Sequence, residues 1–194
     1  MQFVGFEKIV LKNNTLIKTE PKPYIDFNAI AKGYTVDLVA AFLESKNTTD
    51  YLVNIGGELR AKGINIEKQS GWIVGIENPN FDSSQSYDKV IVLKEKAMAT
   101  TGTYRKFKLD DNGRRYAHII DTKTGYPTKT NILSVSVIAD NCMLADGYAT
   151  AFQAMGVENV QQFLTEHSEL QAYLIFENEN QEFEMLSLNN FPVK

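Results

Sequence analysis

Residues 141–156 read NCMLADGYATAFQAMG, and this stretch predicts a helix that ends at Gly156. Apolar side chains recur along it at helical spacing, and glycine is common just after the last turn of a helix. Asp146 and Thr150 are four residues apart, so on a helix their side chains share one face. Carboxylate and hydroxyl oxygens are hard donors of the kind that Mg²⁺ prefers. The pair therefore indicates a metal site, although a solvated polar pair has the same spacing.

Short strand-like segments surround this helix. The run 6–19 reads as a hairpin with its turn at 12–15, and Asn28 is the expected N-cap of a helix over 29–46. A further helix is expected over 157–167. The other expected strands are 24–27, 51–55, 58–62, 71–77, 89–93, 97–101, 107–109, 115–120, 133–139, 172–176 and 182–186. Because most strands follow one another through turns, the predicted fold is α+β, a largely antiparallel sheet with inserted helices, in a single domain over 1–194.

The composition is that of an ordinary globular chain, with 194 residues, 43% hydrophobic and 23% charged. A net charge of −4 argues against nonspecific binding of nucleic acid, which needs a basic face. No apolar run is long enough for a transmembrane helix, and the N-terminal residues show no export signal. Cys142 is the single cysteine, and its apolar neighbours predict a buried side chain. The sequence has no glycine-rich nucleotide loop, Cys/His metal cluster or Gly-x-Ser-x-Gly elbow, so the common nucleotide enzymes and hydrolases are not supported.

The segment DFNAIAKG at 26–33 places a carboxylate, Asp26, at a strand end and a lysine, Lys32, in the first turn of a helix. A helix N-terminus offers unpaired N–H groups and partial positive charge, so an anion can bind there. A lysine at this end is disfavoured by the helix dipole, which indicates a phosphate partner. The alternative is that Lys32 is simply solvated.

Three more segments carry residues suited to ligand binding. NIGGE at 54–58 has a glycine pair after a strand, which allows close approach of a ligand or forms a tight turn. MATTGTY at 98–104 has consecutive hydroxyls that fit a phosphate or sugar, or an ordinary strand end. HIIDTKTGYP at 118–127 contains His118, which is either a proton donor and acceptor or a structural hydrogen-bonding residue.

Read together and in order, these segments resemble the ApbE family of FAD:protein FMN transferases. The matching motifs are AIAKGYTVD (29–37), NIGGEL (54–59), MATTGTY (98–104), HIIDTKTGYP (118–127) and ADGYAT (145–150). Thr122 stands where the family often has proline, and Thr103 where aspartate, asparagine or serine is more usual. Proteins of the family usually carry a further segment ahead of the first hairpin, so we expect this chain to be the C-terminal portion of an ApbE-like chain.

The resemblance implies roles for seven residues. The carbonyl of Ala29 and the side chains of Asp146 and Thr150 would bind Mg²⁺. FAD, as substrate, would be contacted by Asp26, by Lys32 and by the backbone of Ile120. His118 would be the acid–base residue near the pyrophosphate.

The implied reaction is transfer of FMN from FAD to a threonine of an acceptor protein in a membrane redox complex, with release of AMP. Two alternatives remain open at this point, namely an FAD pyrophosphatase and a flavin-binding module without turnover. By resemblance alone we expect export to the periplasmic side, with the full-length form held at the membrane as a lipoprotein.

Overall fold

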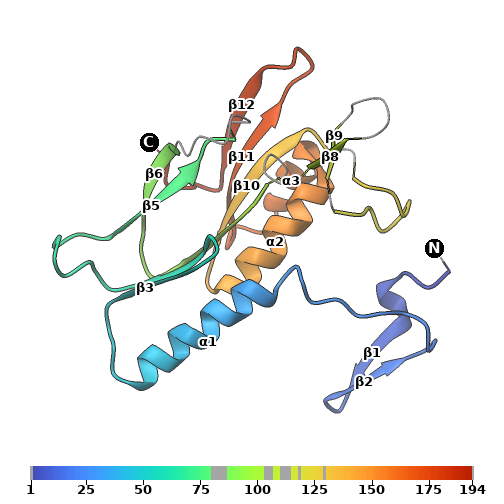
Figure 1. The fold of residues 1–194 in the computed structure, drawn as a ribbon, viewed down its shortest axis with the longest axis horizontal. Helices are drawn as coiled ribbons and strands as arrows, with labels where there is room; N and C mark the ends of the chain where they lie inside the picture. The colour runs from blue at the N-terminus through green and yellow to red at the C-terminus, as the bar shows by residue number, and fades with distance from the viewer. Residues whose placement is uncertain are drawn as a thin grey trace.

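A six-stranded antiparallel sheet lies at the centre of the fold (Figure 1). The computed structural model describes residues 2–79, 87–102, 107–109, 115–117, 119–128 and 130–193. The strand order across the sheet is β12-β11-β10-β7-β4-β3. These strands are β3 (Tyr51–Ile55), β4 (Glu58–Lys62), β7 (Ala97–Gly102), β10 (Ile132–Ala139), β11 (Gln171–Glu177) and β12 (Phe183–Leu188).

Three two-stranded sheets accompany the central one. They are formed by β1 (Ile9–Lys12) with β2 (Thr15–Lys18), β5 (Trp72–Glu77) with β6 (Tyr87–Leu93), and β8 (Phe107–Leu109) with β9 (Arg115–Ala117). A short 3₁₀ helix, Phe6–Lys8, precedes β1. All strand pairs that the structure describes are antiparallel, so the predicted α+β class is confirmed.

Three helices pack on one face of the central sheet. They are α1 (Ala31–Ser45), α2 (Cys142–Met155) and α3 (Val157–Leu164), and in Figure 1 the N-terminal ends of α1 and α2 approach each other. Alternation along β7 separates the two faces, because Ala97 and Ala99 pack with the helices while Met98 packs with the β5–β6 hairpin. Cys142 is fully buried beside α1, as predicted. Within the described residues, no helix is both long and apolar enough to cross a membrane.

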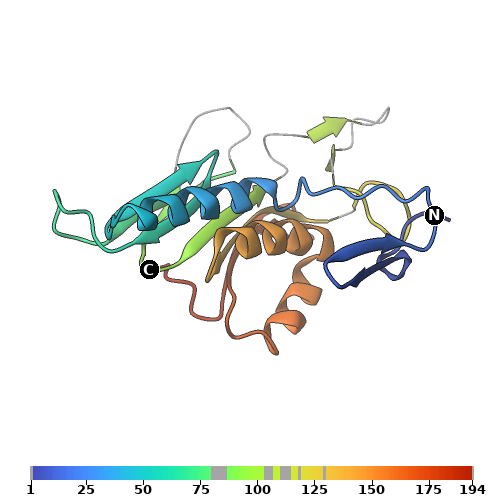
Figure 2. The same ribbon diagram turned by 90° about the horizontal axis from the view of Figure 1, so that it is seen from below.

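The β1–β2 hairpin lies apart from the central sheet, as the two views show (Figures 1 and 2). Its turn consists of Asn13 and Asn14, with φ of 49° and 58°. A two-residue turn that joins twisted strands needs positive φ at both positions, and asparagine tolerates it well. The predicted hairpin is therefore confirmed, although none of its strand residues is buried.

Two predictions near α1 are wrong. Residues 24–27 form no strand, because this stretch follows two prolines and pairs with no described strand. Asn28 is not the N-cap of α1, which begins at Ala31 after Ile30 and has no side-chain cap of its own. The predicted helix over 157–167 is shorter and ends at Leu164.

Candidate functional site at the junction of α1 and α2

Two glycines allow the start of α1 to touch α2. A Cβ atom at Gly33 would lie 2.3 Å from the carbonyl oxygen of Cys142 and 2.8 Å from Cβ of Asp146. A Cβ atom at Gly147 would lie 3.1 Å from Cγ2 of Ile30. The turn that precedes α1, with Ala29 next to Ile30, is therefore packed against the turn of α2 that carries Asp146.

Asp146 is nearly buried, with 4% of its surface exposed, and its Oδ2 accepts a hydrogen bond of 2.8 Å from the backbone N–H of Gly33. This bond satisfies one of the N–H groups that the first turn of α1 leaves without an intrahelical partner. Burial raises the pKa of the Asp146 carboxyl, while the Gly33 N–H and Lys32 act in the opposite direction. Among the described residues none donates a hydrogen bond to the second carboxylate oxygen, Oδ1.

Thr150 lies one turn beyond Asp146 on α2 and is half-buried. The predicted helix thus brings the carboxylate and the hydroxyl to one face, as their spacing requires. Ala29 is exposed in the turn where the N–H of Ile30 donates to Phe27. Carboxylate, hydroxyl and carbonyl are all oxygen donors and fit Mg²⁺. In the described part of the chain, no group of three or more His, Cys, Asp or Glu side chains is placed to hold a metal ion.

Lys32 forms an ion pair with Glu58, which begins β4 directly after the Gly56-Gly57 turn. The Glu58 side chain is 2% exposed, whereas that of Lys32 is 54% exposed. Burial raises the pKa of Glu58, and Lys32 acts against this rise. The second oxygen of Glu58, Oε2, is buried and has no hydrogen-bond partner within the described residues.

From the sequence, the expected partner of Lys32 was a phosphate or solvent, and Glu58 was given no role. A signal for Glu58 was present in the strand pattern. Leu59 and Ala61 alternate with Glu58 and Arg60 along β4, and the apolar pair packs toward the β5–β6 hairpin. The two charged residues must therefore face the helices, where a buried charge needs a partner.

Asp26 makes its described hydrogen bonds within the turn ahead of α1 and not with the residues of the junction. Its carboxylate is exposed and accepts hydrogen bonds from the backbone N–H of Asn28 at 2.6 Å and from Nδ2 of Asn28 at 3.0 Å. The side chain therefore shapes the turn ahead of α1. No described contact links Asp26 to Asp146, so the predicted contact of Asp26 with FAD stays a prediction.

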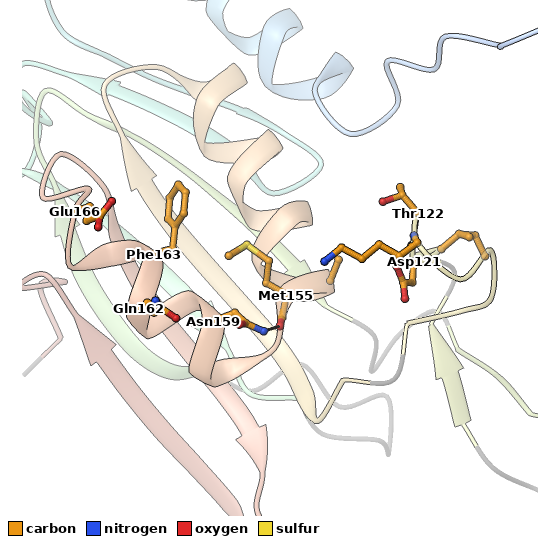
Figure 3. Close-up of a pocket in the computed structure, with 10 residues that line it drawn as sticks. Asp121, Thr122, Met155, Asn159, Gln162, Phe163 and Glu166 are labelled. Atoms are coloured by element: carbon orange, nitrogen blue, oxygen red, sulfur yellow. Dashed lines mark hydrogen bonds between the residues drawn. The ribbon is translucent and has the colours of Figure 1, made fainter. Parts of the chain in front are cut away.

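Ile120 lines a pocket of about 640 Å³ between the 120–123 loop and the corner where α2 meets α3 (Figure 3). The loop is shaped by Asp121, whose carboxylate accepts hydrogen bonds from Lys123 and Thr124. Figure 3 shows Met155 and Phe163 across the pocket from Asp121 and Thr122. The pocket lining consists of Ile120, Asp121, Thr122, Lys123, Ala154, Met155, Asn159, Gln162, Phe163 and Glu166.

The pocket adjoins the helix face of the candidate metal ligands. Ala154 lines the pocket and follows Thr150 by four residues, as Thr150 follows Asp146. Residues at this spacing lie above one another on a helix, about 6 Å apart along its axis. One face of α2 therefore runs from the junction with α1 to the pocket beside Ile120. His118 lies outside the described residues, and its predicted role stays a prediction.

Residues 1–174 match the model of the ApbE family. The FAD:protein FMN transferase of Haemophilus influenzae is 41% identical over 182 residues, which are 92% of this chain and 52% of that protein. The enzyme of the same name from Vibrio cholerae is 42% identical over 154 residues, which are 79% of this chain and 45% of that protein. This chain thus spans about half the length of the curated relatives that it matches.

Solved structures agree with the sequence comparison. The flavin transferase ApbE from Vibrio cholerae superimposes with a TM-score of 0.86 at 36% identity, over 98% of this chain and 59% of that one. The apo form of the flavinyl transferase ApbE from Pseudomonas stutzeri gives a TM-score of 0.81 at 32% identity, over 96% and 56% of the two chains. By its family match, its relatives and its fold, this chain belongs to the ApbE family.

Proposed function

We propose that this chain forms the metal- and flavin-binding part of an enzyme that transfers FMN from FAD to a threonine of an acceptor redox protein, with release of AMP. The relatives from Haemophilus influenzae and Vibrio cholerae are FAD:protein FMN transferases, which supports flavin transfer. The observation that carries the proposal is the position of Asp146, which is nearly buried at the contact of two helices and has one oxygen without a donor among the described residues. Because the chain spans about half of its relatives, the proposal concerns the protein that contains it.

The residues at the junction suit a diphosphate with its metal. Mg²⁺ would be held by the carbonyl of Ala29 and the side chains of Asp146 and Thr150, and would offset the negative charge of the FAD diphosphate. Lys32 adds a positive charge at the N-terminus of α1, where the helix dipole also favours an anion. The buried carboxylate of Glu58 forms an ion pair with the ammonium group of Lys32, while about half of the Lys32 side chain stays exposed and could contact a ligand.

The proposed chemical step is a displacement at phosphorus. The acceptor threonine oxygen forms a bond to the FMN-side phosphorus, and the bond from that phosphorus to the AMP oxygen breaks, so AMP leaves with the electron pair. His118 takes the proton of the threonine hydroxyl. Ile120 lines the pocket beside the 120–123 loop, and this supports a contact between its backbone and FAD. The pocket would receive part of the flavin nucleotide.

The test is Asp146→Ala in the full protein that contains this chain, with FAD, Mg²⁺ and a flavin-acceptor protein. Flavin covalently bound to the acceptor is read by in-gel fluorescence, and AMP by chromatography. We expect transfer to fall by at least about a hundredfold, because the substitution removes the only carboxylate among the proposed ligands. The matched control is Asp140→Ala, a carboxylate just ahead of α2 that pairs with Lys96 on the surface and is expected to leave transfer unchanged.

Unchanged transfer in Asp146→Ala would overturn the metal assignment. Release of AMP without an acceptor would show hydrolysis of FAD in place of transfer. Binding of FAD in calorimetry without either product would identify a flavin-binding module. On family resemblance alone, we further propose that the acceptor belongs to a membrane redox complex and that the protein acts on the periplasmic side.

A further inference from the structure

Each of the helices α1 and α2 supplies a carboxylate that accepts hydrogen bonds from backbone N–H groups in the first turn of the other helix. Asp146 of α2 accepts the N–H of Gly33 in the first turn of α1 at 2.8 Å. In return, Asp37 of α1 accepts the N–H of Cys142 and the N–H of Met143, in the first turn of α2, each at 2.9 Å. On each helix the donor and the carboxylate are four residues apart, so the two contacts mirror each other along one shared face.

The Asp37 carboxylate is itself held in place. Arg60 of β4 donates from Nη1 to Asp37 Oδ1 at 2.6 Å, and both side chains are partly buried. A carboxylate at a helix N-terminus satisfies otherwise unpaired N–H groups and interacts favourably with the helix dipole. Asp37 therefore ties the first residues of α2 to α1 and, through Arg60, to the central sheet.

The N-terminus of α2 has a second cap that makes a different connection. Asn141 accepts the N–H of Leu144 at 2.9 Å, but Asn141 immediately precedes α2 in the chain. Such a cap stabilises the helix and does not fix its position relative to α1. Asp37 alone among these two caps connects α2 to the helix that carries Gly33.

We propose that Asp37 is a positioning residue for the candidate metal site, an inference that rests on the proposed function. Asp37 fixes the position of the start of α2 relative to α1. This position determines whether Asp146 Oδ2 lies within hydrogen-bonding distance of the Gly33 N–H. A shift of Asp146 by about 1.5 Å, the rise of one helical residue, directly away from the Gly33 N–H would lengthen the 2.8 Å bond beyond hydrogen-bonding distance. Asp146 would then lose the orientation in which Oδ1 would bind a cation.

The test compares Asp37→Asn with Asn141→Ala in the full protein that contains this chain. Three quantities are measured: the exchange rate of the Gly33 amide by nuclear magnetic resonance, the affinity for Mg²⁺ by calorimetry, and the thermal midpoint of unfolding. For Asp37→Asn we expect the Gly33 amide to exchange roughly tenfold faster and Mg²⁺ to bind roughly tenfold more weakly, because charge-assisted hydrogen bonds are lost. For Asn141→Ala we expect a lower midpoint, with Gly33 exchange and Mg²⁺ affinity close to those of the wild type.

The inference is overturned if Asp37→Asn leaves Gly33 exchange and Mg²⁺ affinity unchanged, or if Asn141→Ala alters both to the same extent. Should Asp37→Asn fail to fold, Arg60→Gln, which keeps Asp37 but removes its guanidinium partner, should change both quantities in the same direction by a smaller factor. A wild-type full protein without affinity for Mg²⁺ would count against the proposed function. Faster Gly33 exchange in Asp37→Asn would still support the positioning role in that case.

Discussion

The α1–α2 junction and the β1–β2 hairpin are held by opposite kinds of interaction. At the junction, Val36 is fully buried and Asp146 is 4% exposed. In the hairpin, Leu11 is 73% exposed and no strand residue is buried. The hairpin depends on its own turn and ladder, whereas the junction depends on partners more than a hundred residues away in sequence. Substitutions should therefore be costly at the junction and mild in the hairpin.

The largest effect is expected for Gly33→Ala, which attacks the junction directly. The new methyl group would lie 2.3 Å from the carbonyl oxygen of Cys142, and a backbone atom cannot move aside without separating the helices. We expect the free energy of unfolding to fall by about 3 kcal/mol or more. Urea denaturation followed by circular dichroism measures it.

The control for Gly33→Ala is Gly147→Ala on the facing helix. Its methyl group would meet Cγ2 of Ile30 at 3.1 Å, and that side chain can adjust. Because alanine also favours the helix more than glycine does, the net change should stay within about 1 kcal/mol. Equal stability of Gly33→Ala and the wild type would show that the helices are not in close contact in solution.

A second prediction uses pH to compare a buried with an exposed carboxylate. Burial raises the pKa of Glu58 from its usual 4.5, so near this pH the folded state binds more protons than the unfolded state. The stability of the wild type relative to Glu58→Gln should therefore be greatest below pH 4.5 and fall as the pH rises through the raised pKa. Urea denaturation of both proteins over a pH series measures the difference.

Glu44 supplies the opposite case. Hydrogen bonds from Tyr51 and Lys62 lower its pKa, so the stability of the wild type relative to Glu44→Gln should rise with pH and be lost as the pH falls. If the stability differences for Glu58→Gln and Glu44→Gln change with pH in the same direction, burial does not raise the pKa of Glu58.

The smallest effect is expected in the hairpin. Leu11→Ala removes atoms that are mostly exposed and should change the free energy of unfolding by no more than about 0.5 kcal/mol. Val36→Ala, a smaller deletion at a fully buried position of α1, should cost about 2 kcal/mol. If the two variants are equally destabilised, the hairpin packs against another surface in solution, and the comparison fails.

The elements themselves could be predicted from local sequence. The helical spacing of apolar residues predicted α2 and its end at Gly156, where φ is 81°. The Asn13-Asn14 pair predicted the hairpin turn. The shared face of Asp146 and Thr150 also followed from their spacing.

The contacts between elements could not be predicted in the same way. The acceptor for the start of α1 is Asp146, 113 residues further along the chain, and local rules assigned this role to Asn28. Glu58 was overlooked because a glycine pair before a strand reads as a turn. The role of Asp37 could not be predicted from the sequence, because its partners at the start of α2 are 105 and 106 residues distant.

The reciprocal carboxylate contacts between α1 and α2 have a consequence for folding of the chain during its translation. During translation α1 is made well before α2. Gly33 and Asp37 therefore lack their hydrogen-bond partners on α2 until more than a hundred further residues have been translated. Closing a loop of this length is entropically costly and slow compared with forming a hairpin. The nascent chain therefore acquires the candidate metal site late, after the strands between the two helices have been made.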